Sequence, residues 1–146
     1  MTVIVDDEAI ERARQAGASV VVHTPVVSSA TLSAHCGGEI VLKVESLQRT
    51  GSFKIRGAMS KVAALGEEAR RGVVAGSAGN HAQAVAFAAR AAGVPCEIYV
   101  PLGASIAKTE AARGYGRCRH ASPRAPSRTA SAASEVIQPI RQLSGR

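Results

Sequence analysis

Lys54 lies in a segment whose composition suits covalent chemistry on a carbonyl group. The segment spans residues 48–58 and reads QRTGSFKIRGA. An amine must be uncharged to attack a carbonyl carbon, and apolar neighbours and nearby cations both favour its uncharged form. Phe53 and Ile55 flank Lys54, and two cations lie close in sequence, Arg49 and Arg56. Lys54 is therefore a candidate Schiff-base former, although most lysines in proteins are solvated surface residues.

A second segment, SAGNHAQ at residues 77–83, could bind an anion. Its small residues allow consecutive backbone N–H groups to converge, and a helix that starts behind them adds its positive end. The carboxyl ends of strands in a parallel sheet are also where ligands bind. The alternative is helix capping, in which Asn80 is the N-cap and Gln83 completes a capping box. The two roles do not exclude each other.

Both segments lie in an alternation of expected strands and helices. Capping residues and hydrophobic patterns predict helices at residues 7–16, 29–35, 53–65, 81–92 and 105–113. Short apolar runs predict strands at 20–22, 39–44, 72–76 and 96–100. Such alternation is typical of βαβ crossovers, so the sequence predicts an α/β fold with a parallel sheet covered on both faces.

Composition excludes several classes of protein. Of the 146 residues, 46% are hydrophobic and only 3% aromatic, so a core would consist of Ala, Val, Ile and Leu. The sequence holds no apolar run long enough for a membrane span, and its acidic start does not resemble a secretory signal. The three cysteines share no metal or redox spacing, which predicts a reduced, cytoplasmic setting and no metal site.

The net charge of +7 is concentrated at the end of the chain. Residues 1–116 carry 12 Lys and Arg against 10 Asp and Glu, whereas residues 117–146 carry six Arg against one Glu. This basic tail has few large apolar residues and no period, which predicts disorder. Because it also lacks aromatic residues for stacking on bases, we do not expect nucleic-acid binding.

Taken together, the two segments resemble the fold-type II pyridoxal-phosphate enzymes, and within them the threonine/serine dehydratases (threonine ammonia-lyases). Residues 48–58 look like the family's cofactor-lysine motif, and residues 77–83 look like its substrate-carboxylate loop. Four more stretches match in order and spacing: HTPVV at 23–27, LS at 32–33, VLKVESLQ at 41–48 and VPLGASIAK at 100–108. The resemblance covers residues 7–116 and implies a sheet of the tryptophan synthase beta type.

Residues near the two motifs separate the branches of this family. Cysteine-synthase-like members and threonine synthases usually place Asp after the lysine, whereas Ile55, Arg56 and Gly57 follow here, as in the dehydratases. Serine racemases carry Ser as a second base in the carboxylate loop, where this chain has Ala78. The resemblance therefore favours β-elimination over racemisation.

The resemblance implies a role for each candidate residue. Lys54 would hold pyridoxal 5'-phosphate and, once the substrate amine displaces it, would remove the Cα proton. Loss of the β-hydroxyl would convert L-threonine or L-serine into a 2-keto acid and ammonia. The Asn80 side chain would bond the ring hydroxyl of the cofactor, and Phe53 would pack near the ring. The substrate carboxylate would be held by Ser77, Ala78, Gly79, Asn80 and His81.

After Gly116 the sequence departs from the family pattern. Family members are more than twice this length and carry a glycine-rich loop for the cofactor phosphate, yet no run of three glycines occurs here. We therefore expect residues 1–116 to be the N-terminal part of a dehydratase domain in a truncated or frameshifted reading frame, with little activity alone. The alternatives are a non-catalytic fragment, a serine racemase, or a polyanion-binding protein. Family members are homo-oligomers, an assembly that a shortened chain need not form.

Overall fold

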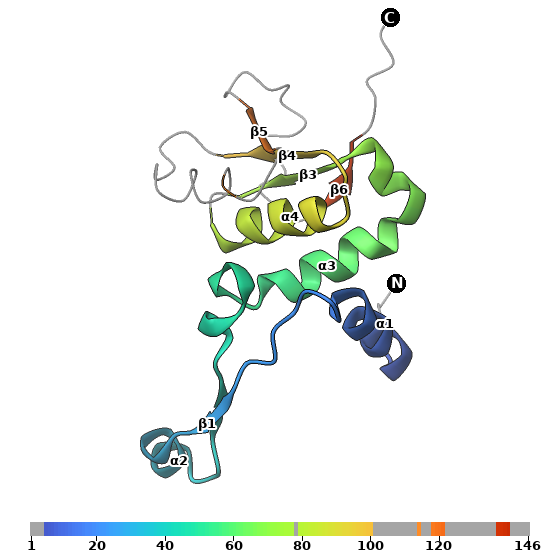
Figure 1. The fold of residues 1–146 in the computed structure, drawn as a ribbon. Helices are drawn as coiled ribbons and strands as arrows, with labels where there is room; N and C mark the ends of the chain where they lie inside the picture. The colour runs from blue at the N-terminus through green and yellow to red at the C-terminus, as the bar shows by residue number, and fades with distance from the viewer. Residues whose placement is uncertain (1–4, 78, 101–113, 115–117, 122–136, 141–146) are drawn as a thin grey trace, which may run out of the picture.

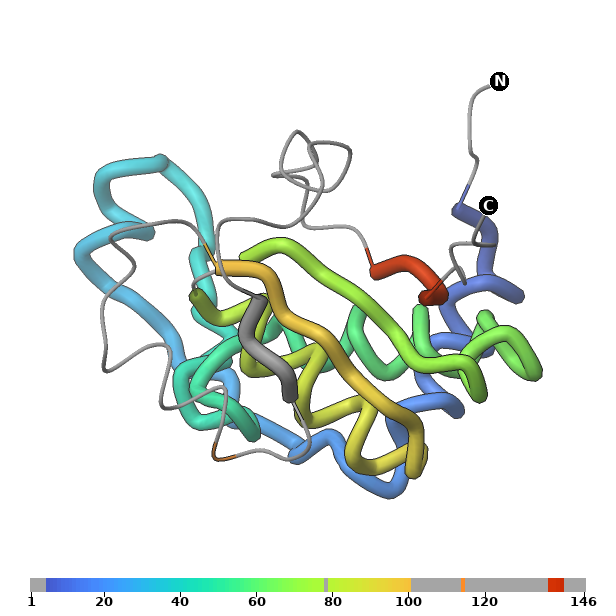
Figure 2. Tube along the Cα trace, turned by 90° about the horizontal axis from the view of Figure 1, so that it is seen from above, coloured from blue at the N-terminus to red at the C-terminus, as the bar shows by residue number. Residues whose placement is uncertain are grey.

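The computed structural model describes residues 5–77, 79–100, 114 and 137–140, and the backbone of 118–121. A four-stranded sheet in the order β5-β4-β3-β6 forms one end of the molecule, and a two-stranded arm extends from the other (Figure 1). Strands β3 (Val73–Gly76) and β4 (Cys96–Tyr99) are parallel, with Val73 opposite Cys96. Seen from above, they run side by side over the helices (Figure 2). The predicted α/β class is confirmed.

The helices stack beneath the sheet in successive layers. Helix α4 (Asn80–Ala91) contacts β3 and β4, α3 (Lys54–Leu65) packs on α4, and α1 (Asp7–Gly17) packs on α3. Because α4 lies between the sheet and α3, it is buried nearly all round, which its alanine-rich sequence allows. Among the described residues the helices cover only one face of the sheet, where the sequence predicted both. The helix expected at 105–113 lies outside these residues.

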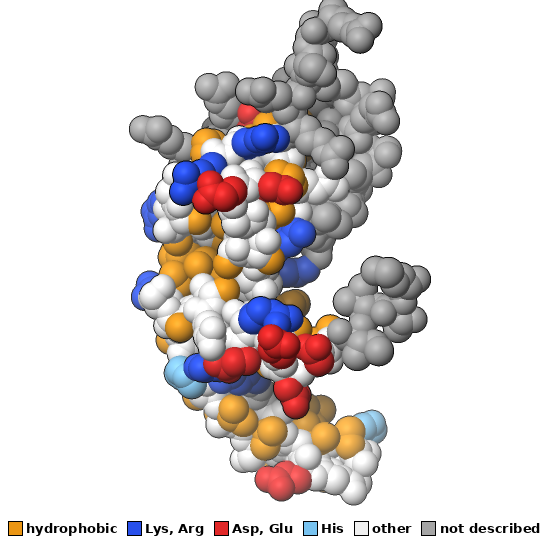
Figure 3. All heavy atoms as spheres, turned by 90° about the vertical axis from the view of Figure 1, so that its right-hand side faces the viewer, with side chains coloured by type: hydrophobic (Ala, Val, Ile, Leu, Met, Phe, Trp, Pro, Cys, Tyr) orange, Lys and Arg blue, Asp and Glu red, His pale blue; other side chains and the backbone are white. Residues whose placement is uncertain are grey.

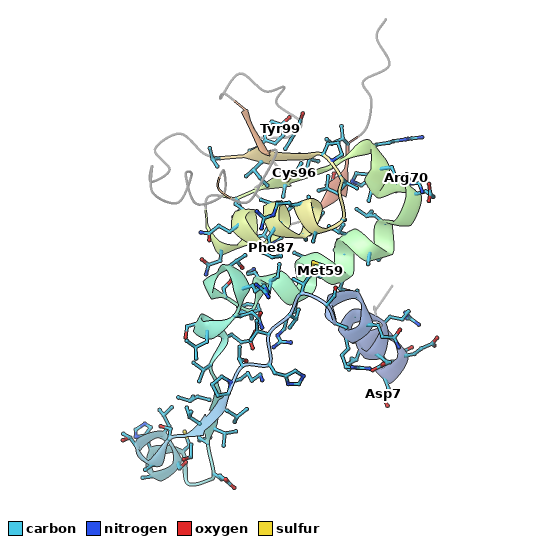
Figure 4. All side chains as sticks on the ribbon, viewed as in Figure 1. Asp7, Met59, Arg70, Phe87, Cys96 and Tyr99 are labelled. Atoms are coloured by element: carbon cyan, nitrogen blue, oxygen red, sulfur yellow. The ribbon has the colours of Figure 1, made fainter. Side chains whose placement is uncertain are left out.

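The core is built from small and branched side chains, as the composition requires. Its largest fully buried side chains are Ile55, Val73, Val85 and Ile98. Met59 on α3 and Phe87 on α4 are partly buried against this cluster and lie between the two helices (Figure 4). The close approach of α4 to its neighbours therefore follows from the alanines on its surface, with few large side chains to hold the layers apart.

Local capping explains where the first two helices begin. The Asp6 carboxylate accepts a hydrogen bond from the N–H of Ala9 at 2.7 Å, which starts α1. Ser29 caps α2 (Ala30–Cys36) in the same way, and Gly37 ends it with a left-handed φ of 69°. The predicted helices at 7–16, 29–35 and 53–65 are confirmed to within a residue or two.

The arm consists of α2 between β1 (Val26–Ser28) and β2 (Val41–Lys43), which pair antiparallel. It exposes apolar side chains at the lower end of the molecule (Figure 3), among them Val26, Val27, Leu32, Val41 and Leu42. The strand predicted at 20–22 is wrong, because these residues form no strand. Their backbone groups instead bind side chains: Val22 N–H and C=O pair with the Gln48 amide, and Val20 C=O accepts from Arg49.

Two short strands occur in the tail, where the sequence predicted none. The backbone of β5 (Cys118–Ala121) pairs parallel with β4, and β6 (Gln138–Pro139) pairs antiparallel with β3. Ile137 is buried in the core, with 4% of its surface exposed. The other residues of 117–146 lie outside the described residues, except Ile140, so their disorder stays a prediction. No helix in the described part is long and apolar enough to cross a membrane.

Gly72 holds the start of β3 against β6, and a side chain there should destabilise the fold. Its φ is 99°, and a Cβ would lie 2.7 Å from Ile140 Cδ1 and 3.0 Å from the Pro95 carbonyl oxygen. We expect Gly72→Ala to lower the free energy of unfolding by about 2 kcal/mol. Gly38→Ala is the matched control, because a Cβ there meets nothing within 4 Å. Urea denaturation measures both, and equal effects would contradict this account.

Candidate functional site

Lys54 is the first residue of α3, and its side chain is half-buried. The N-cap of this helix, Phe53, makes no capping hydrogen bond, and the Lys54 N–H reaches Ser52 Oγ only at 3.4 Å. The Lys54 Nζ lies 5.6 Å from the centroid of the Phe53 ring, which is 60% exposed. The lysine amine thus sits beside an accessible aromatic face at the start of a helix.

A cavity of about 420 Å³ opens beside Lys54. Its volume is in the range of sites for small molecules. The wall combines the first two turns of α3 with the start of α4 and the residue before β6. It is lined by Phe53, Lys54, Arg56, Gly57, Ala58, Lys61, His81 and Ile137. These residues include three cationic side chains and no carboxylate, so the cavity suits an anionic ligand.

The loop after β3 leads directly into α4. Ser77 N–H donates to the Tyr99 carbonyl at 3.0 Å, which fixes the loop to the end of β4. Ser77 Oγ accepts from the N–H of Gly79 at 3.2 Å. The predicted N-cap at Asn80 is wrong, because Gly79 is the N-cap and no side chain caps this helix. No capping box therefore competes for the amide groups at this helix N-terminus, which favours the anion-binding interpretation of the loop.

The structure unites part of the predicted site. Lys54, Phe53 and His81 line one cavity, and His81 is only 7% exposed. Ser77, Gly79 and Asn80 lie on the adjoining loop but are not among the residues that line the cavity. Ala78 lies outside the described residues. The joint placement of Lys54 and His81 at one cavity follows from the packing of α3 on α4.

The two arginines expected to act on Lys54 are bound to other groups. Arg49 Nε donates to the Val20 carbonyl at 2.7 Å. Arg56 donates from Nε and Nη2 to the two carboxylate oxygens of Glu45, each at 2.8 Å. Arg56 therefore reaches the cavity wall as half of an ion pair, so the expectation that it acts on Lys54 as a lone cation is corrected.

Glu45 is the centre of this polar cluster. Its Oε1 also accepts from the Thr24 hydroxyl at 2.6 Å, and Lys43 Nζ donates to the Thr24 carbonyl at 2.6 Å. The hydrogen bonds from Arg56, the largest cause, lower the Glu45 pKa from its usual 4.5 to about 2, against the opposing effect of burial. Because the pKa is lowered on folding, the pair stabilises the fold above about pH 4.5 and this contribution disappears as pH falls towards 2.

Sequence reasoning missed several residues that shape the site. Gln48 is 4% exposed and binds Val22 through both amide atoms, at 2.9 and 2.8 Å. Thr50 has a left-handed φ of 65°, an uncommon conformation for a β-branched residue, and its buried Oγ1 has no hydrogen-bond partner. Such strain clusters at functional sites. No sequence signal identified the cavity residues Lys61 and Ile137.

Comparison with known proteins identifies the family of the chain. A profile of the family described as pyridoxal-phosphate dependent enzymes matches residues 17–142. The chain belongs to this family. The match includes both the segment around Lys54 and the loop before α4, and it continues past Gly116, where the sequence analysis ended the resemblance.

Relatives within the family carry several activities in their names. The chain is 52% identical over 110 residues to the L-threonine ammonia-lyase of Thermotoga maritima, covering 75% of this chain and 27% of that relative. It is 50% identical over 94 residues to an L-threo-3-hydroxyaspartate ammonia-lyase of a Pseudomonas species, covering 64% and 30%. The structure of maize serine racemase matches with a TM-score of 0.75 at 36% identity, covering 94% and 44%. The chain thus spans less than a third of the length of these two curated relatives.

The described residues fit a pyridoxal phosphate. Lys54 brings a primary amine, the group that reacts with the aldehyde of this cofactor, to a cavity that can hold a small molecule. The Phe53 ring offers an apolar face, and the cationic lining complements a phosphate. No group of three or more His, Cys, Asp or Glu that could hold a metal ion occurs in the described part of the chain.

Proposed function

We propose that this chain supplies the lysine of an ammonia-lyase site that converts L-threonine or L-serine into a 2-keto acid and ammonia, through β-elimination of water followed by hydrolysis that takes up one water. The observation that carries the proposal is the placement of Lys54 and His81 on one cavity, beside the loop at the start of α4. The relative named L-threonine ammonia-lyase, at 52% identity, supports the substrate class.

Each residue of the site would have a distinct task. Lys54 Nζ would hold the cofactor and then take the proton from the substrate Cα. The amide groups at the N-terminus of α4, near Gly79 and Asn80, would orient the substrate carboxylate. The Asn80 side chain would bond the cofactor ring hydroxyl, and Phe53 would cover the ring and exclude water. Bound pyridoxal phosphate supplies an electron sink for the pair left at Cα.

Racemisation is the second candidate, because the maize structure with a TM-score of 0.75 is a serine racemase. A racemase needs a second base on the opposite side of the substrate Cα. The sequence has Ala78 at the loop position where the family resemblance places a serine base. Alanine cannot carry a proton, so elimination remains the favoured reaction.

We expect the purified chain with pyridoxal 5'-phosphate to form 2-keto acid from L-threonine only slowly, far below the typical enzyme value of about 10 per second. The reason is that the sequence offers no run of three glycines to cradle the cofactor phosphate. Hydrazone formation measures the keto acid, and chiral chromatography measures D-serine from L-serine.

Three outcomes separate the candidates in this experiment. Slow keto acid formation that Lys54→Ala abolishes supports the lyase proposal. D-Serine without keto acid favours the racemase, and neither product with no cofactor bound favours a non-catalytic fragment. We further propose a cytoplasmic location, and a homo-oligomer for any longer chain that carries this domain.

A further inference from the structure

Three separate segments of the chain meet beside the start of α3. Thr24 comes from the segment before the arm, Glu45 follows the arm, and Arg56 lies in the first turn of α3. Glu45 binds both others, through the Thr24 hydroxyl at 2.6 Å and two donors of Arg56 at 2.8 Å. Thr24 is 5% exposed, the Glu45 side chain 15% and the Arg56 side chain 42%, so the Thr24 end of this contact is buried and its Arg56 end is open to solvent.

The Glu45–Arg56 pair lies at the first turn of α3, where the N-cap residue makes no side-chain capping bond. Helices usually begin with a side chain that binds the free amide groups of the first turn. Phe53 provides no such bond, and Ser52 Oγ is 3.4 Å from the Lys54 N–H. The two-donor contact from Arg56 to Glu45 therefore restrains the first turn of α3, to which Lys54 also belongs.

Gln48 and Arg49, which precede α3, are also held in place by hydrogen bonds. Gln48 holds Val22 through two hydrogen bonds and also accepts from the Arg49 N–H at 2.9 Å. Arg49 itself binds the Val20 carbonyl. The loop before Lys54 is thus restrained by Gln48 and Arg49, while the helix turn after Lys54 is restrained by Arg56.

We propose that Glu45 and Arg56 are positioning residues that hold the first turn of α3 so that the Lys54 amine faces the cavity. Arg56 lines this cavity together with Lys54, so a shift of the turn moves the amine relative to any molecule bound there. This inference rests on the proposed function only in taking Lys54 as the lysine that reacts with the cofactor.

Labelling with pyridoxal 5'-phosphate tests this role without requiring turnover. Borohydride reduction after short incubations fixes the label, and peptide mapping gives the initial rate at each lysine. Lys61 lines the same cavity, so it serves as the internal reference. Glu45→Gln keeps the size of the side chain and removes its charge. We expect the rate at Lys54 to fall about tenfold, with the rate at Lys61 nearly unchanged.

A pair with the same chemistry elsewhere provides the control. Arg14 donates from Nε and Nη2 to Glu11 at 2.6 Å each, on α1 and away from the cavity. Glu11→Gln should leave the rate at Lys54 unchanged. Arg56→Gln should match Glu45→Gln, and the double variant should lose no more than either, because the two residues act as one unit.

The outcomes distinguish the two proposals. If the wild-type chain labels Lys54 no faster than Lys61, the proposed function fails at its first step. If the wild type prefers Lys54 and Glu45→Gln retains that preference, the positioning role is overturned. An equal fall at Lys54 and Lys61 with a lower melting temperature would also overturn it, because it indicates a structural role alone.

Discussion

Lys54→Ala should remove nearly all of the label that pyridoxal 5'-phosphate and borohydride leave in the cavity. An aldehyde reacts reversibly with any lysine, so selectivity must come from binding the phosphate and ring beside one amine. Lys54 is half-buried at the cavity, beside the Phe53 ring, whereas Lys61 is exposed. Wild-type protein should therefore carry its label on Lys54 with a visible absorbance band, and the variant should lose both.

Lys61→Ala is the matched control for this experiment. It removes a primary amine and a positive charge from the same cavity wall, about two turns further along the same face of α3. We expect it to weaken cofactor binding by a small factor while the label stays on Lys54. If wild-type protein instead carries its main label on Lys61, Lys54 is not the lysine that reacts with the cofactor.

Ile137→Asp should unfold the chain or bring it close to unfolding. Ile137 has 4% of its surface exposed, belongs to the core cluster with Ile55 and Ala58, and lines the cavity beside Lys54. Truncating a buried isoleucine to alanine costs about 2–5 kcal/mol, and burying a carboxylate in the same place costs more. Domains of this size have only about 5–15 kcal/mol of stability in total.

An exposed isoleucine is the control for this change. Ile10 on α1 is 57% exposed, so Ile10→Asp should alter the free energy of unfolding by only about 0.5 kcal/mol. Urea denaturation followed by circular dichroism compares the two variants and Ile137→Ala. If all three unfold at the wild-type midpoint, residues 137–140 are dispensable, as expected for a disordered tail, and their place in the core is refuted.

Elements with local signals were predictable from the sequence. The caps at Asp6, Ser29 and Gly37 and the run of apolar residues along α3 define those helices through contacts a few residues apart. The strand prediction at residues 20–22 failed because their backbone groups bind side chains from a distant part of the chain instead of another strand. Val22 binds Gln48, and the Val20 carbonyl binds Arg49. Sequence propensity does not contain such tertiary contacts.

The candidate site shows the same division. The resemblance of the two motifs to one family implied a shared site, and Lys54 and His81 line one cavity because α3 packs on α4. The partner of Arg56 was not predictable, since Glu45 is 11 residues away, on the far side of an irregular turn. The contribution of Ile137 was not predictable, because its segment has no aromatic residues and no apolar period. The neighbouring residues Gln138 and Pro139 pair with β3 through the backbone, and such pairing depends little on side-chain type.

Hydrogen bonds hold the two ends of the arm together at its base. The sequence of the arm can therefore change in evolution without moving Lys54. Val44 N–H donates to the Pro25 carbonyl at 3.0 Å, and the contacts of Thr24 with Lys43 and Glu45 close the same junction. A loop closed at its base can gain or lose residues at a cost that grows only with the logarithm of its length. Insertions, deletions and new surface chemistry between Val26 and Lys43 can therefore accumulate while the junction keeps the distance from the arm to α3 constant. The arm is thus a place where related chains can diverge in what they contact without altering the chemistry at the cavity.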